Sequence, residues 1–249
     1  MIIFSIVRVL YRFIGFLLMA FICGGSAAIL KILGYSYPVI FKVFKFWRKS
    51  QMALMNVKME LDGNIPDRPG ILMSNHRSYL DVILLPSEFP YSFVAKSSVK
   101  KWPLIGWGAS VINTVWVNRQ SKESRKETRE QLQKRLEKNQ SVVIFPEGTT
   151  HRGPEVLPFK PGMFHTVAQG GFPIIAAAIE YRDPEVAFVD DDLFVPHFFK
   201  VFGRSSFPVK VIYSDAFYGE DGDELRERVH SWVSEHTRQF RKEWDDQPD

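Results

Sequence analysis

The feature that most limits what this chain can fold into is an uncharged apolar run close to its N-terminus. The run extends from Phe13 to Leu30, with Arg8 and Arg12 before it and Lys31 after it. Such a stretch avoids water, either as a helix in a bilayer or as a helix packed on a protein core. Crossing a hydrocarbon layer of roughly 30 Å takes about 20 helical residues, so the run is borderline in length. Both a spanning and a re-entrant helix are compatible with it.

The distribution of charge indicates a membrane partner for this end of the chain. The first 59 residues contain eight Lys or Arg and no Asp or Glu, whereas the rest contains 24 Lys or Arg against 28 Asp or Glu. A nucleic-acid-binding protein would carry its positive charge on the folded domain, so we expect no nucleic-acid partner. We expect the basic, apolar N-terminus to bind an anionic lipid bilayer.

A second helix is predicted directly after this run. Ser36 can cap it and Pro38 suits its first turn. Apolar side chains recur at helical spacing, with basic side chains between them: Tyr37, Ile40, Phe41, Phe44 and Trp47, and Lys42, Lys45, Arg48 and Lys49. This pattern predicts a helix whose aromatic face lies among lipid headgroups. Gly24, Gly25, Ser26 and Gly34 offer points at which the chain can turn back.

Two other interpretations of the N-terminus stay open. A basic start, an apolar stretch and small residues from Gly24 to Ala28 also fit a cleaved signal peptide. Alternatively, the second helix packs on the rest of the protein and its lysines face water. We favour a membrane-anchoring helical segment over residues 1–55 and a separate domain over residues 56–249.

The second part of the chain alternates short β-type runs with helical patterns. Strands are predicted at 57–61, 71–74, 92–96, 111–117, 142–145, 173–181 and 209–214, and helices at 79–85, 122–139, 162–169 and 223–244. This alternation predicts an α/β domain with a mostly parallel or mixed sheet covered by helices. Cys23 is the only cysteine, which excludes an intrachain disulfide and a cysteine-based zinc site. We expect no metal.

The first chemical motif reads NHRSYLD over residues 75–81 and follows a predicted strand directly. His76 falls at the carboxyl end of that strand, where open α/β sheets bind their ligands. Asp81 lies five residues later and can reach one imidazole nitrogen, which leaves the other nitrogen to take a proton from a hydroxyl. No Ser or Cys nucleophile is needed if the nucleophile belongs to the substrate. We expect backbone N–H groups at the helix that follows His76 to support an oxyanion.

The second motif reads FPEGTT over residues 145–150 and places Glu147, Gly148 and Thr149 at the same edge of the sheet. Together the two motifs resemble those of the glycerophospholipid acyltransferase family, typified by lysophosphatidate acyltransferases. Three further stretches of the chain resemble this family: Lys96, Pro103, Gly106 and Arg119; Leu157 to Gly162; and Phe172 to Ile175.

The resemblance implies a role for each matching position. His76 would be the general base and Asp81 its orienting partner, with no covalent enzyme intermediate. The acceptor would be bound by Glu147, Gly148, Thr149, Arg119, Lys96 and Lys160. The acyl donor would be acyl-CoA or an acyl-carrier protein, with no cofactor. The resemblance also implies a place at the cell membrane, with the catalytic domain on the cytoplasmic side.

Two departures from the family pattern affect the choice of acceptor. Thr150 stands where many members have arginine, and Ala176 stands where proline is common; threonine cannot form a bidentate phosphate clamp. We expect 1-acylglycerol-3-phosphate as acceptor, giving phosphatidate, with another lysolipid such as a lyso-ornithine lipid as the alternative. A lipid hydrolase and a non-enzymatic lipid-binding module are the remaining alternatives. The sequence contains no G-x-S-x-G, phosphate-loop or H-E-x-x-H motif.

Overall fold

The computed structural model describes residues 2–67, 69–85, 87–101, 105–118, 120–138, 140–189 and 192–246. In this part of the chain a mixed sheet has the strand order β1-β7-β6-β2-β5-β3-β4. The strands are β1 (Val57–Asp62), β2 (Ile71–Ser74), β3 (Tyr91–Lys96), β4 (Val115–Val117), β5 (Ser141–Ile144), β6 (Ile174–Tyr181) and β7 (Phe207–Phe217). Strands β2 to β6 are mutually parallel, β7 is antiparallel to β6, and β1 is parallel to β7. The predicted α/β class with a mixed sheet is confirmed.

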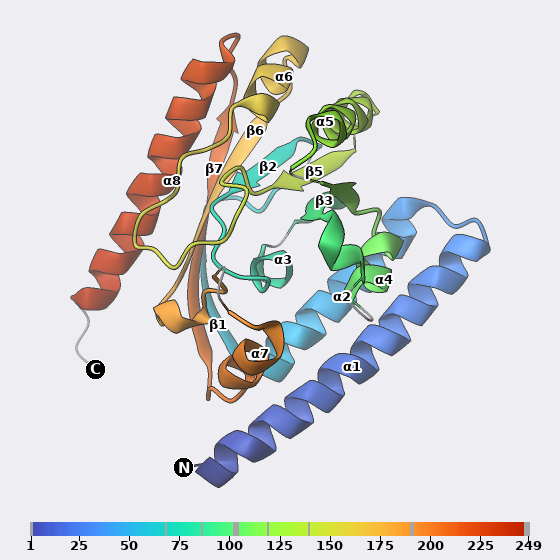
Figure 1. The fold of residues 1–249 in the computed structure, drawn as a ribbon, viewed down its shortest axis with the longest axis vertical. Coiled ribbons are helices and arrows are strands. Elements are labelled where there is room, and N and C mark those ends of the chain that lie inside the picture. Colours follow the sequence, from blue (N-terminus) through green and yellow to red (C-terminus); the bar gives the residue numbers. More distant parts are fainter. Residues whose placement is uncertain are drawn as a thin grey trace.

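Helices cover both faces of the sheet (Figure 1). One face carries α5 (Lys122–Glu137), α6 (Gly162–Gly170) and α8 (Gly222–Asp245), and the other carries α2 (Tyr37–Met55), α3 (Asp81–Leu84) and α7 (Phe194–Phe202). The short helices η1 (Ser97–Lys101) and α4 (Ile105–Val111) follow β3, and η2 (Pro184–Val186) follows β6.

The alternation of side chains along each strand produces two cores. On β2, Ile71 and Met73 pack in the core with α5, α6 and α8, whereas Leu72 packs in the core with α2, α3 and α7. Successive residues of a strand point to opposite faces, so a strand covered on both faces is apolar at every position. This is why a run as short as Ile71–Ser74 was recognisable in the sequence.

Helix α1 (Ile2–Ile32) lies outside α2 and also contacts α4 and α7. The chain reverses between α1 and α2 at Gly34, whose φ of +79° suits glycine. The turn predicted there is confirmed, whereas Gly24, Gly25 and Ser26 lie inside α1. Gly24 is packed against the ring of Trp107, which fills the space that a Cβ would need.

Arg12 fixes α1 to the domain from within its apolar sequence. Its side chain is only 1% exposed. The guanidinium donates to the carbonyl oxygens of Leu54 (3.0 Å), Phe202 (3.0 Å), Arg204 (2.5 Å) and Ser205 (3.3 Å). These carbonyls lie at the C-terminal ends of α2 and α7, where backbone oxygens lack helical partners. One arginine therefore holds three helices together.

The aromatic face predicted to lie among lipid headgroups is buried against the sheet instead. Phe41 and Phe44 of α2 belong to the core and contact Tyr91 of β3. Arg48 is also buried and donates to the carbonyl oxygen of Ile83 at 3.3 Å. The headgroup placement of this face was wrong, because an aromatic stripe has the same helical period whether it covers a sheet or enters a membrane. Packing on the domain, the alternative interpretation, is what the structure shows.

Two further elements differ from the sequence predictions. The strand expected at 111–117 is only β4, because α4 ends at Val111 and Asn113, with a φ of +58°, closes that helix. Helix α7 was not predicted at all. Its residues His197 and Phe198 are buried, whereas Phe199 is 42% exposed.

Candidate active site

The structure brings His76 and Asp81 together at the carboxyl end of β2. Imidazole Nδ1 lies 2.7 Å from Asp81 Oδ2, and Asp81 is fully buried. Asp81 begins α3, and the tight turn between β2 and α3 folds back on its carboxylate. The backbone N–H groups of Arg77 and Ser78 donate to the same Oδ2 at 2.7 and 3.0 Å. The five-residue spacing therefore gives the predicted hydrogen-bonded pair.

The other imidazole nitrogen of His76 is left open to a substrate. Among the described residues, Nε2 has no hydrogen-bond partner, and 16% of the side chain is exposed. Phe145, at the end of β5, stacks on the imidazole with ring centroids 4.0 Å apart and an interplanar angle of 13°. The ring is thus fixed by Asp81 at one edge and by Phe145 on one face. A neutral imidazole with Nδ1–H bound to a carboxylate presents Nε2 as a base.

Glu147 connects the loop that contains His76 to the loop that contains Leu157. Its Oε1 accepts the backbone N–H of His76 at 2.6 Å, and its Oε2 accepts that of Leu157 at 2.9 Å. The side chain is 3% exposed, and this burial raises its pKa to about 7 despite both hydrogen bonds. The geometry gives Glu147 a structural role in holding the histidine loop. A contact of Glu147, Gly148 or Thr149 with the acceptor stays a prediction.

The turn after His76 restricts where an oxyanion could be bound. Support from backbone N–H groups at the helix that follows His76 stays a prediction. The N–H groups of Arg77 and Ser78 are both bound to Asp81, and that of His76 is bound to Glu147. Because these three groups are bound to the Asp81 and Glu147 carboxylates, they do not also bind an oxyanion.

Two of the three basic residues predicted to bind the acceptor, Lys96 and Lys160, lie in the described part of the chain. Lys96 ends β3, which is separated from β2 only by β5, and it is exposed. Lys160 is exposed and its side chain fills the space beside Gly148, whose φ is +74°. Its backbone N–H donates to the carbonyl oxygen of Pro146 at 2.9 Å. Arg119, like Pro103, lies outside the described residues.

A buried charge network flanks the site and was not predicted. The Arg77 guanidinium donates to Glu180 Oε2 at 2.7 and 3.0 Å and to the carbonyl oxygen of Glu155 at 2.9 Å. Glu180 also accepts a hydrogen bond from Arg241 of α8 at 2.8 Å. Arg77 therefore points away from His76 and holds the loop that follows the second motif. In the sequence, this network was indicated by Glu180, a charged residue inside the apolar run of β6.

Arg152 is the nearest arginine along the chain to Thr150, and it pairs with Glu185 at 3.0 Å. Lys200 binds the same carboxylate. Arg152 is 41% exposed, so it lies in a mixed-charge cluster and is not a free phosphate clamp. Within the described ranges, no three His, Cys, Asp or Glu side chains are grouped so that they could hold a metal ion.

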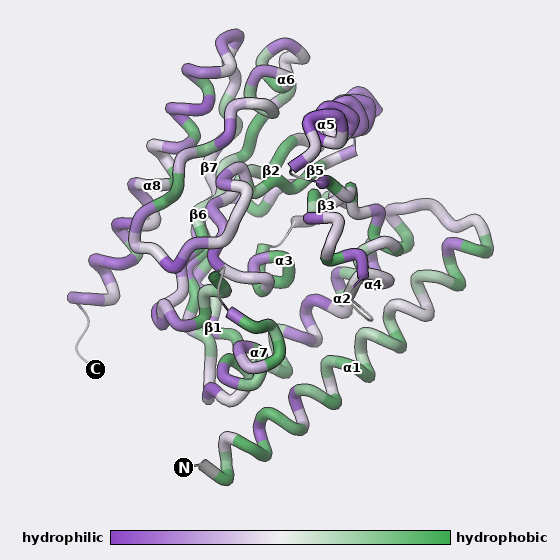
Figure 2. The backbone as a smooth tube through the Cα atoms, in the orientation of Figure 1, coloured by the Kyte–Doolittle hydropathy of each residue, from purple (hydrophilic) through white to green (hydrophobic). Residues whose placement is uncertain are grey.

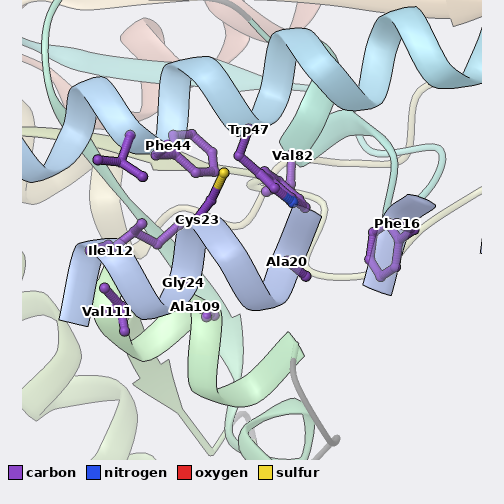
Figure 3. Close-up of a pocket in the computed structure, with 13 residues that line it drawn as sticks. Phe16, Ala20, Cys23, Gly24, Phe44, Trp47, Val82, Ala109, Val111 and Ile112 are labelled. Atoms are coloured by element: carbon purple, nitrogen blue, oxygen red, sulfur yellow. The ribbon is translucent and has the colours of Figure 1, made fainter. Parts of the chain in front are cut away.

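An apolar cavity of about 140 Å³ lies between α1, α2 and α4 and reaches α3 (Figure 3). Phe16, Ala20 and Cys23 of α1 face Phe44 and Trp47 of α2 across it. Its α3 wall is Val82, the residue after Asp81, and its α4 wall includes Gly108 and Ala109. The cavity therefore borders α3 at the residue that follows Asp81 and extends along α1.

Comparison with known proteins gives a consistent result. A family model described as Acyltransferase matches residues 56–180. The 1-acyl-sn-glycerol-3-phosphate acyltransferase of Neisseria gonorrhoeae is 32% identical over 137 residues, 54% of each chain, so the match spans about half of that relative. The lyso-ornithine lipid O-acyltransferase of Pseudomonas aeruginosa is 27% identical over 203 residues, 79% of this chain and 78% of that one.

A solved structure is also similar over almost the whole chain. It is the 1-acyl-sn-glycerophosphate acyltransferase PlsC from Thermotoga maritima, with a TM-score of 0.76, 19% identity and 95% of both chains covered. At this identity the likeness concerns the fold, including the N-terminal helices.

Proposed function

The chain belongs to the acyltransferase family, and from this premise we propose that it transfers a fatty acyl group from an acyl thioester to a free hydroxyl of a lysolipid. The observation that carries the proposal is the geometry of His76, whose Nδ1 is held by a buried carboxylate and whose Nε2 is free among the described residues. This arrangement suits a general base, and a thioester needs little further activation.

In the proposed reaction the substrate hydroxyl is the nucleophile. His76 Nε2 takes the hydroxyl proton as the oxygen attacks the thioester carbonyl carbon. The C–S bond of the tetrahedral intermediate then breaks, and the imidazolium returns the proton to the leaving thiolate. Asp81 stabilises the imidazolium between these two steps. No bond to the enzyme forms at any stage.

For the acceptor we propose 1-acylglycerol-3-phosphate first, giving phosphatidate. Lys96 and Lys160 supply positive charge at the edge of the sheet where His76 lies, and Arg119 is expected to add to it. A phosphate monoester carries close to two negative charges at neutral pH. Its binding is therefore favoured by several basic side chains together.

A lyso-ornithine lipid is the second acceptor, and two observations favour it. Threonine occupies position 150, so the bidentate clamp expected for a phosphate is missing there. The cluster of Arg152, Glu185 and Lys200 offers both signs of charge, which suits a zwitterionic head group. The Pseudomonas aeruginosa relative, whose match covers 79% of the present sequence, is named as a lyso-ornithine lipid O-acyltransferase.

We assign the apolar cavity to the acyl chain. It is lined by aliphatic and aromatic side chains, and its α3 wall is Val82, the residue after Asp81. We propose that the thioester end of a bound acyl chain lies toward His76. Burying each methylene contributes about 0.8 kcal/mol, which is enough to select among chain lengths.

We further propose that the protein sits on the cytoplasmic side of the cell membrane. In the described part of the chain, α1 is the helix that is long and apolar enough to cross a bilayer, and 11% of its most apolar window is buried. In Figure 2, α1 is coloured hydrophobic along much of its length, whereas α5 and α8 are mostly hydrophilic. Because α1 contacts α2, α4 and α7 along its length, we expect it to lie along the bilayer surface.

The proposal is tested with purified protein, a labelled acyl-CoA or acyl-carrier protein, and a panel of lysolipids that differ in head group. We expect one acceptor class to be acylated, and His76→Ala to lose at least about a thousandfold in turnover while lysolipid binding survives. Asp81→Asn should also turn over slowly while staying folded.

Three outcomes contradict the proposal. A near-wild-type rate for His76→Ala would exclude that residue as the base. Release of free fatty acid from the donor without any acceptor would identify a hydrolase. Binding to vesicles with no transfer to any lysolipid would identify a lipid-binding module.

A further inference from the structure

Tyr181, the last residue of β6, reaches the catalytic pair from a strand that neither motif includes. Its hydroxyl donates to Asp81 Oδ1 at 2.6 Å, and the residue is 1% exposed. Strand β6 is the immediate neighbour of β2, and Asn75 joins their ends by two hydrogen bonds with Ile179, at 2.8 and 2.9 Å. The position of the tyrosine is therefore set by the sheet itself.

The two oxygens of Asp81 have different partners. Oδ2 is hydrogen-bonded to the His76 imidazole and to the two backbone N–H groups of the turn, whereas Oδ1 accepts a hydrogen bond from the Tyr181 hydroxyl. Asp81 is fully buried. Without Tyr181, Oδ1 would have no donor among the described residues.

The titratable groups around the pair keep the tyrosine protonated. Glu147 and His151 bind the backbone of His76, Arg77 is bound to Glu180, and Tyr79 lies nearby on the turn. Burial, together with the Asp81 and Glu180 carboxylates, holds the pKa of Tyr181 well above its usual range. Its hydroxyl is therefore a hydrogen-bond donor at acidic and at neutral pH.

We propose that Tyr181 is a positioning residue for acyl transfer, which holds Asp81 in its productive orientation and limits the proton affinity of that carboxylate. The inference rests on the proposed general-base role of His76. A carboxylate that loses one hydrogen-bond donor is a stronger base and attracts the neighbouring imidazolium more strongly. Removing the hydroxyl should therefore raise the pKa of His76 and let Asp81 rotate.

The test is Tyr181→Phe, compared with Tyr91→Phe as a matched control. Tyr91 is 2% exposed and its hydroxyl donates to the carbonyl oxygen of Leu85 at 2.7 Å, away from Asp81. We expect Tyr181→Phe to lower kcat about tenfold, the loss of one hydrogen bond to a charged group, with little change in KM. The acidic limb of its kcat/KM profile should move upward by about half a pH unit.

An NMR titration of the His76 imidazole gives a readout that does not depend on turnover. We expect its pKa to rise in Tyr181→Phe and to stay unchanged in Tyr91→Phe. If Tyr181→Phe does not fold, 3-fluorotyrosine at position 181 keeps the shape and strengthens the donor, so the His76 pKa should fall instead.

The proposal is overturned if the His76 titration and kcat are the same in wild type and Tyr181→Phe, since the tyrosine would then only fill the core. This failure differs from that of the proposed function. If the wild type acylates no lysolipid, acyl transfer is excluded, yet the NMR titration still shows whether Tyr181 sets the His76 pKa.

Discussion

Glu147 is the residue whose ionisation state matters most for the histidine loop. Its two carboxylate oxygens accept backbone N–H groups on both sides of the site, and only the ionised form can accept both bonds fully. Its pKa of about 7 lies above the model-compound value of 4.5. Between these two values the folded protein binds more protons than the unfolded chain.

This raised pKa predicts a pH dependence of stability. The contribution of Glu147 is fully present below pH 4.5 and is lost as the pH rises through about 7, so the free energy of unfolding falls across this window. Denaturant unfolding of wild type and Glu147→Gln at several pH values isolates it. We expect the wild type to lose about 3 kcal/mol relative to the variant between the two pH limits. A pH-independent difference would contradict the assignment.

The sequence predicted the hydrogen bond between His76 and Asp81 but not the residues that support this pair. His76 and Asp81 are five residues apart on one turn, so their hydrogen bond follows from local geometry. Tyr181 is 100 residues from Asp81, and Glu147 is 71 residues from His76. Their contacts depend on the strand order β6-β2-β5, which a single sequence does not specify.

At the scale of elements, the apolar cavity is enclosed mainly by three helices, α1, α2 and α4. Gly108 on α4 lines the cavity, and a Cβ at this position would meet no atom within 4 Å. Gly25 on α1 is equally open but does not line the cavity. The two glycines therefore make a matched pair for testing what the cavity binds.

We expect Gly108→Leu to shift the preference toward shorter acyl donors, by about fourfold for each methylene that no longer fits. Gly25→Leu should leave the preference unchanged. The measurement is competition between two labelled donors that differ only in chain length. Equal preferences in both variants would show that the acyl chain lies elsewhere.

Helices and strands were predictable from the sequence where the pattern of apolar residues fits only one kind of surroundings. The short, continuously buried runs of the central strands and the polar α5 with its narrow stripe at Leu132 and Leu136 were both recognised. The aromatic stripe of α2 was misplaced and α7 was missed, because apolar aromatic segments serve cores and membranes equally well.

On the scale of the whole molecule, exposed apolar side chains are concentrated on α1. Phe4, Ile14 and Phe21 are between 62% and 72% exposed. A surface of this size on a soluble protein marks an interaction site. The α1 helix is about 46 Å long, more than a perpendicular crossing requires, and it lies against the domain.

This surface predicts which residues meet lipid. In a Cys23→Ala background, a fluorescent label at Phe21→Cys should show blue-shifted emission and quenching by spin-labelled lipid on adding anionic vesicles. The same label at Tyr218→Cys, a position 57% exposed that follows β7 and precedes α8, should show neither. Equal quenching at both positions would rule out α1 as the docking surface.

The arginine that joins α1 to the C-terminal ends of α2 and α7 also imposes an order in time. The carbonyl oxygens of Phe202 and Arg204 that bind Arg12 are made 190 and 192 residues later. At a synthesis rate of roughly 5–20 residues per second, α1 waits about 10 to 40 s for these partners. During that interval the apolar surface of α1 is not yet packed on the domain, so we expect α1 to bind lipid before the rest of the chain folds against it.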